Sequence, residues 1–127
     1  MSWSWIVPIE ISEERIKDIL ITAIESPPGE HWCKLTGYCQ HDDMDLYDSF
    51  FKKSSGWMQF SELDDNGDYS KDHKLCWFGE TDSIHSGIKV MAMRYPDHFG
   101  DWLSGKDDAI TAYVFLQCCL LGEVIYG

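Results

Sequence analysis

The sequence has no hydrophobic run long enough to cross a membrane. Its apolar stretch Val114–Leu121 falls well short of the roughly 20 residues that a membrane-spanning helix needs. The first residues lack the basic start of a signal peptide, and the apolar segment Trp5–Val7 ends at Pro8. We therefore expect a cytosolic protein that makes no membrane contact.

Basic residues are also scarce. The chain has 10 Lys and Arg against 22 Asp and Glu, which gives a formal charge of −12. Lys52-Lys53 is the one adjacent basic pair, and there is no basic stripe that could neutralise a row of phosphates. This balance argues against direct binding to nucleic acid and favours positively charged partners.

Motifs typical of catalysis are missing. The sequence contains no Gly-x-Ser-x-Gly, no phosphate-binding glycine-rich loop and no His-Glu-x-x-His. His31, His85 and His98 are scattered along the chain, and no motif places any of them with a nucleophile and an orienting group. We expect a protein without enzymatic activity or cofactor. An enzyme stays the alternative, because carboxylates with shifted pKa values in a cleft cannot be recognised from a sequence.

The turn around Asp64-x-Asn66-x-Asp68 only partly matches a calcium-binding loop. These residues match the opening of an EF-hand loop, but Tyr69 stands where its glycine belongs and Leu75 where its bidentate Glu belongs. An acidic hairpin tip explains the segment better. We therefore expect no calcium site.

The five cysteines are an odd number, and we expect free thiols rather than disulfides in a reducing compartment. Cys118-Cys119 point to different faces of a helix and cannot chelate one metal. Zinc stays an alternative, without the usual paired spacing. Its candidate ligands are Cys33, Cys39, His41, His73 and Cys76.

The hydrophobic content of 44%, with 14% aromatic residues, is that of one folded domain spanning residues 1–127. Helices are expected where apolar residues recur with helical period and where capping residues stand. The segments are Glu13–Glu25 after the cap Ser12, a short helix around Met44–Phe51, Asp82–Tyr95, Pro96–Leu103 and Ala109–Leu121. Asp107 or Asp108 is expected to cap the last of these helices, and Gly122 is expected to end it. The last is apolar nearly all round, as a buried helix would be.

Short aromatic-rich segments predict strands. They are Ser2–Ile9, His31–Cys39, Gly56–Leu63, Lys74–Phe78 and a final strand Val124–Tyr126. Asp65-Asn66-Gly67 is a turn signal that predicts a hairpin. The expected fold is α+β: a small, mostly antiparallel sheet covered by about three helices, with the C-terminal helix buried.

Much of the acidic excess lies between Asp42 and Asp82. Carboxylates on loops and a hairpin tip can engage Arg and Lys through charge-assisted hydrogen bonds, and nearby aromatic side chains can anchor a partner. The alternative is that these charges coat a solvated face. The candidate partner-binding residues are Asp42, Asp43, Asp45, Asp48, Glu62, Asp64, Asp65 and Asp68, with Trp57 and Tyr69 as anchors.

The C-terminal third carries a resemblance. Tyr95–Asp101, Asp108–Ala112 and Val114–Gly127 resemble the ending of a family of small phage and prophage proteins. In the first half, a helix like Glu14–Glu25 leads to a Trp-Cys dipeptide there too, here Trp32-Cys33. His31 and Tyr113 depart from the pattern, in which an aromatic and an acidic residue are common at these places.

The resemblance implies an accessory gene product that acts in the cytoplasm of an infected bacterium. The family brings no established catalytic residues. Small acidic phage proteins of this kind are often inhibitors of host defence, including anti-CRISPR proteins and DNA mimics. By this analogy we expect a phage-encoded inhibitor that binds the basic, nucleic-acid-binding surface of a bacterial defence protein.

Two other functions stay open. One is a sponge that sequesters a nucleotide defence signal, for which the available cations are Arg15, Arg94, Lys34 and Lys89. The other is a structural or assembly accessory of a phage. An exposed aromatic patch would in addition make a homodimer plausible.

Overall fold

The computed structural model describes residues 9–25, 32–39, 45–52, 56–62, 75–79 and 82–126. The predicted α+β class, with an antiparallel sheet and a buried C-terminal helix, is confirmed. The described helices are α1 (Glu13–Glu25), α2 (Leu46–Lys52), α3 (Asp82–Arg94), α4 (Pro96–Leu103) and α5 (Ala109–Leu121). The strands are β1 (Cys33–Tyr38), β2 (Trp57–Glu62) and β3 (Leu75–Gly79).

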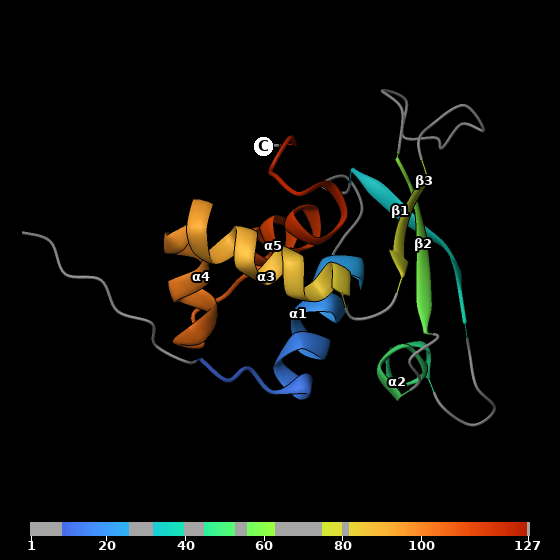
Figure 1. Ribbon diagram of the computed structural model, residues 1–127, viewed down its shortest axis with the longest axis horizontal. Coiled ribbons are helices and arrows are strands. Elements are labelled where there is room, and N and C mark those ends of the chain that lie inside the picture. The colour runs from blue at the N-terminus through green and yellow to red at the C-terminus, as the bar shows by residue number, and fades with distance from the viewer. Residues whose placement is uncertain are drawn as a thin grey trace, which may run out of the picture.

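The sheet is antiparallel with the strand order β1-β2-β3. Strands β2 and β3 pair as the expected hairpin arms, with Phe60 opposite Cys76, while the tip between them lies outside the described residues. The pairing of β1 with β2 shifts register between Leu35 and Gly37. In Figure 1 the sheet lies to one side of the helices α1, α3, α4 and α5, and α2 lies at one end of it.

Helix α5 is the centre of the core. It carries no charged residue, and eight of its thirteen residues are buried. The Asp108 side chain accepts a hydrogen bond from the Thr111 N–H and starts the helix, and Gly122 ends it with a φ of 77°. Both ends agree with the sequence-based expectation. A helix without a polar stripe must be covered on several sides, and α1, α3, α4 and β3 all pack against it.

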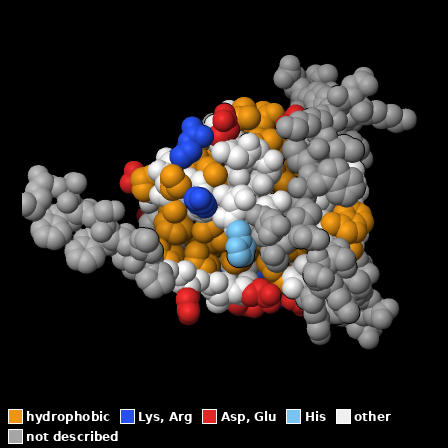
Figure 2. Space-filling view, in the orientation of Figure 1, with side chains coloured by type: hydrophobic (Ala, Val, Ile, Leu, Met, Phe, Trp, Pro, Cys, Tyr) orange, Lys and Arg blue, Asp and Glu red, His pale blue; other side chains and the backbone are white. Residues whose placement is uncertain are grey.

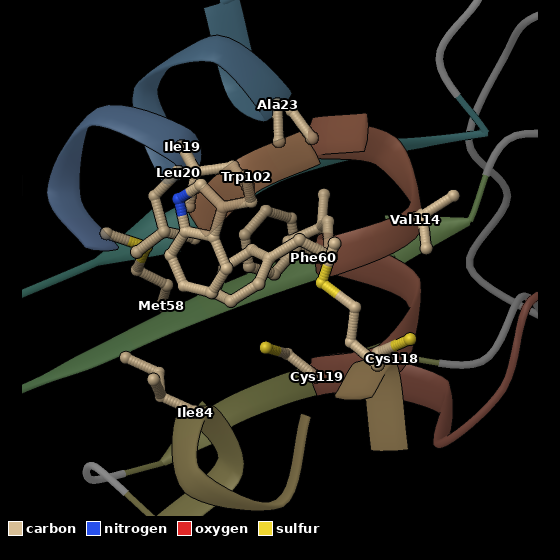
Figure 3. Packing of buried hydrophobic residues seen from close by; sticks show 14 of the residues in the cluster. Ile19, Leu20, Ala23, Met58, Phe60, Ile84, Trp102, Val114, Cys118 and Cys119 are labelled. Atoms are coloured by element: carbon tan, nitrogen blue, oxygen red, sulfur yellow. The ribbon is translucent and has the colours of Figure 1, made fainter. Parts of the chain in front are cut away.

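Helix α3 approaches α5 closely because Gly87 has no side chain. A Cβ at Gly87 would lie 2.3 Å from the Cys119 Sγ and 2.7 Å from the Cys119 Cα. The core continues into the sheet through Met58 and Phe60, which are 0% and 1% exposed. Figure 3 shows Trp102 between the side chains from α1 and those from the sheet and α5.

Helix α1 buries one side. Ile19, Leu20 and Ala23 are part of the core, as the apolar stripe predicts, and the Ser12 hydroxyl accepts a hydrogen bond from the Arg15 N–H at 3.2 Å. The opposite side of α1 faces outward. This leaves an exposed helix surface that the core does not need.

The predicted final strand Val124–Tyr126 is wrong. These residues are described and form no strand, because their backbone groups bond to the side chains of Gln117 and Tyr95 instead. Of the predicted first strand Ser2–Ile9, residues 2–8 lie outside the described part, and Ile9 is not in a strand. Within the described ranges, no helix combines the length and apolar character needed to cross a membrane.

Candidate functional site

The outward side of α1 carries three exposed carboxylates. Glu14, Asp18 and Glu25 are spaced at i, i+4 and i+11, which places them on one face of the helix. That face lies opposite the buried stripe. The three carboxylates therefore form a row that points to solvent.

Helix α2 adds carboxylates along one flank of this row. The Lys17 Nζ lies 3.0 Å from Asp48 Oδ1 and 3.5 Å from Glu14 Oε2, so it ties α2 to α1. The hydrogen bond with Asp48, together with the attraction of both carboxylates, raises the pKa of Lys17. Asp45 Oδ1 accepts a hydrogen bond from the Asp48 N–H at 2.8 Å, which holds the start of α2 in place.

Tyr47 of α2 belongs to the buried core. Its side chain is 5% exposed, and burial raises the pKa of Tyr47 to about 12, with smaller contributions from Glu25 and Asp45. The negative charges of Glu25 and Asp45 thus act on the same phenol. The end of α1 and the start of α2 belong to one electrostatic environment.

The other flank of the row is the turn between α4 and α5. The Arg15 guanidinium donates to the backbone carbonyls of Trp102 and Leu103, and this fixes the end of α4 against α1. Asp18 and Asp107 line the cleft beside this contact. Because Arg15 bonds to backbone oxygens rather than carboxylates, it anchors the cleft without pairing with either Asp.

We call this surface the acidic face. It consists of Glu14, Asp18, Glu25, Asp45, Asp48 and Asp107. Its two cations, Arg15 and Lys17, are both engaged in the contacts described above. Figure 2 views another side of the molecule, where Lys, Arg and His side chains lie over the region of α3 and the Asp and Glu side chains gather toward the edges. On the side that Figure 2 shows, the Asp and Glu side chains therefore lie mainly at the rim.

The structure separates the residues proposed from sequence. Asp45 and Asp48 belong to the acidic face, where Asp45 caps α2 and Asp48 pairs with Lys17. Glu62 and Trp57 are half-buried at opposite ends of β2, and Trp57 lies against Gly37, where an added Cβ would be 3.3 Å from its ring. The remaining proposed residues lie outside the described part: Asp42, Asp43, Asp64, Asp65, Asp68 and Tyr69.

Four members of the acidic face were not proposed from sequence. The sequence pattern assigns Glu14, Asp18 and Glu25 only to a helix, and Asp107 only to a possible helix cap. The spacing of the α1 carboxylates opposite the apolar stripe was a signal that could have identified them. No such signal marks Asp107. Its position beside Asp18 of α1 depends on how the α4–α5 turn packs against that helix.

Cys118 and Cys119 of α5 are buried free thiols. Burial raises the pKa of Cys118 to about 11 and that of Cys119 well above its ordinary value, so both thiols stay protonated at neutral pH. Two of the candidate zinc ligands are described: Cys33 is buried, and the Cys39 Sγ accepts a hydrogen bond from the Trp57 N–H. The other candidates, His41, His73 and the side chain of Cys76, lie outside the described residues. Among the described side chains, no three His, Cys, Asp or Glu residues converge to hold a metal ion.

The cations considered for a nucleotide site lie on separate parts of the fold. Arg15 bonds to the end of α4, and Arg94 lies 4.0 Å from Glu123 Oε2 and over the Tyr95 ring. Lys34 is exposed on β1 and Lys89 is exposed on α3. Nothing in this placement gathers them around one phosphate group.

Comparison with known proteins gives no relative. No protein family model, no curated protein and no solved structure matches the chain.

Proposed function

We propose that this chain is a non-enzymatic, phage-encoded inhibitor that acts in the host cytoplasm. Its acidic face binds a basic, nucleic-acid-binding surface on a bacterial defence protein and blocks it. The observation that carries the proposal is the row of Glu14, Asp18 and Glu25 on α1, flanked by Asp48 on α2 and Asp107 after α4.

The charges on α1 are spaced more widely than the phosphates of a nucleic acid strand, so the row does not copy a phosphate backbone. Residues four apart on a helix are separated by about 6 Å along its axis. A nucleic acid strand presents one phosphate for about every 3.4 Å of duplex axis. The row is sparser than a phosphate backbone, but a cleft lined with Arg and Lys can still receive it through charge-assisted hydrogen bonds.

The contacts that hold α1 against α2 and α4 support the proposal. The Lys17–Asp48 pair fixes α2 against α1, and the Arg15 guanidinium fixes α4. A partner that binds preorganised carboxylates loses less conformational entropy than one that must order flexible loops. The phage and defence context comes from the resemblance of the C-terminal third, whereas the acidic face supports the class of partner.

The experiment is a capture from bacterial lysate with the tagged chain, followed by competition with nucleic acid. The captured protein should release its DNA or RNA when this chain binds, and binding should weaken as salt rises. Salt-insensitive capture, or a ternary complex in which nucleic acid stays bound, would contradict the proposal.

A matched pair of variants locates the contact. Asp18→Asn/Glu25→Gln removes two charges from the acidic face, and Asp97→Asn/Glu123→Gln removes two exposed charges outside it. We expect the first variant to lose affinity and the second to bind like the parent chain. Equal losses would show that net charge, rather than the acidic face, drives association.

A further inference from the structure

An open cleft lies between α1 and the turn that joins α4 to α5. Its volume is about 370 Å³, near the lower end of the range of about 300–1,000 Å³ that is typical of small-ligand sites. Its lining includes Arg15 and Asp18 from α1, Trp102 and Leu103 from the end of α4, and Asp107 from the turn. A helix about 10–12 Å across would not fit into this space, whereas one side chain of a partner would.

The cleft has one carboxylate more than it has cations. Asp18 and Asp107 are exposed, and within the described ranges neither carboxylate takes part in a hydrogen bond or an ion pair. The Arg15 guanidinium donates to the carbonyls of Trp102 and Leu103 instead. Two carboxylates and one guanidinium leave the lining with a formal charge of −1. A single cationic side chain would neutralise this charge.

The walls of the cleft are held by hydrogen bonds within the chain. The Gly105 N–H donates to the Trp102 carbonyl at 3.2 Å, and the Lys106 N–H donates to the Asp101 carbonyl at 2.8 Å. Arg15 joins this turn to α1 from the other side. A ligand that enters a preformed cleft loses less free energy to ordering than one that must shape it.

A guanidinium suits these groups better than an ammonium does. It presents five N–H donors in one plane, so it can donate to two carboxylates at once. It is also more weakly hydrated, which makes it the preferred cation for ion pairs at interfaces. Leu103 is half-buried in the lining, and the apolar stem of an arginine can lie along it. Arginine is one of the residues that most often dominate the binding energy of an interface.

We propose that this cleft receives one arginine side chain of the partner. The guanidinium donates to the carboxylates of Asp18 and Asp107, and its stem lies on Leu103. This contact rests on the proposed function for the partner, a protein with a basic surface, and names the residue that anchors it. Binding of arginine to the cleft can be measured without that partner, so the two proposals can fail separately.

Titration of the unmodified full chain with Nα-acetyl-arginine amide tests the cleft directly. The backbone amide NMR signals of Asp18, Gly105 and Asp107 should shift saturably, while that of Phe115 in the middle of α5 should not move. Nα-acetyl-citrulline amide has nearly the same shape without the charge and should give no such shift. No saturable shift with the arginine probe, or an equal shift with the citrulline probe, would overturn the proposal.

Nα-acetyl-lysine amide separates a guanidinium site from a site for any cation. We expect it to shift the same signals with weaker affinity than the arginine probe, because an ammonium cannot present a planar set of donors to both carboxylates. Equal affinity for the two probes would overturn the assignment to arginine.

A matched pair of variants locates the site. Asp107→Asn removes a carboxylate from the cleft, and Asp101→Asn removes an exposed carboxylate that does not line it. Affinity for the arginine probe should fall about tenfold or more in Asp107→Asn, because a charge-assisted hydrogen bond is lost. Asp101→Asn should bind like the parent chain. Equal losses would show that net charge attracts the probe, and would overturn the proposal.

The captured partner separates this contact from the proposed function. If the arginine probe binds in the cleft but no basic defence protein is captured, the proposed function fails and the cleft remains an arginine site. If a partner is captured and its affinity is the same for Asp107→Asn as for the parent chain, the cleft does not receive its arginine. The contact is then overturned while the proposed function stands.

Discussion

Helices α5 and α1 have the same length but opposite designs. Helix α5 has no charged residue and is covered on several sides, whereas α1 buries Ile19, Leu20 and Ala23 and leaves Glu14, Asp18 and Glu25 in solvent. Side chains in α5 are constrained by packing, so their substitution should affect folding. The outward side chains of α1 have few structural constraints, so their charge is available for binding.

The largest expected effect is in α5. Phe115→Ala removes a side chain that is 0% exposed and packs on Trp102 with ring centroids 5.3 Å apart. We expect the free energy of unfolding to fall by about 3–5 kcal/mol, measured by denaturant titration. Ile110→Ala, at a residue of the same helix that is 60% exposed, should change it by less than about 0.5 kcal/mol. Similar losses at both positions would contradict the buried role of α5.

The contact between α3 and α5 gives the next effect. Gly87→Ala places a methyl group against the Cys119 backbone, and overpacking of this kind costs about 1–3 kcal/mol. Gly100→Ala is the matched control, since nothing lies within 4 Å of its added Cβ and alanine favours the helix by about 1 kcal/mol. Chemical unfolding should therefore show opposite signs for the two substitutions. Alanine also favours helix α3 at this position, so the overpacking cost is the difference between the two variants, and a Gly87→Ala chain as stable as Gly100→Ala would mean that the helices are farther apart.

A smaller effect is expected at the start of α5. Asp108→Ala removes the acceptor of the Thr111 N–H at 3.0 Å, and the loss of such a cap costs about 1 kcal/mol. This hydrogen bond also lowers the pKa of Asp108 below its ordinary value of 3.8. The stabilisation is therefore present above that value and is lost as the pH falls through the lower, folded-state pKa.

The control for this cap is Asp108→Asn, which keeps an acceptor oxygen but does not titrate. Thermal unfolding should show that it retains most of the stability and loses the acid dependence of this residue. An unchanged acid dependence in Asp108→Asn would contradict the assignment.

The smallest effect on stability is expected on α1. Glu14→Gln/Asp18→Asn/Glu25→Gln changes exposed side chains outside the core, and we expect about 0.5 kcal/mol or less for each. For the same variant, the loss of binding free energy with the partner should exceed the loss of unfolding free energy. A chain that unfolds after these changes would remove the contrast between α1 and α5.

Elements with local signals could be predicted from the sequence. The caps Ser12 and Asp108, the terminal Gly122 and the hydrophobic stripe of α1 all act within a few residues. The final strand could not be predicted correctly, because its backbone is bonded by Gln117, eight and nine residues earlier, and by Tyr95, 29 residues earlier. A buried glutamine in an apolar helix was the sign that some backbone had to approach it.

The candidate site was only partly predictable. The density of Asp between Asp42 and Asp82 led to Asp45 and Asp48, whereas the residues that complete the acidic face lie on α1 and after α4. Arg15 joins these distant segments through carbonyls 87 and 88 residues away. Charge density along a chain does not reveal such a contact, because the face is assembled by packing.

The most direct test of the account is the salt dependence of partner affinity for the parent chain, for Asp18→Asn/Glu25→Gln and for Asp97→Asn/Glu123→Gln. We expect the slope of log affinity against log salt concentration to become less steep in the α1 variant and to stay unchanged in the other. Equal slopes in all three chains would contradict a role for the acidic face in binding.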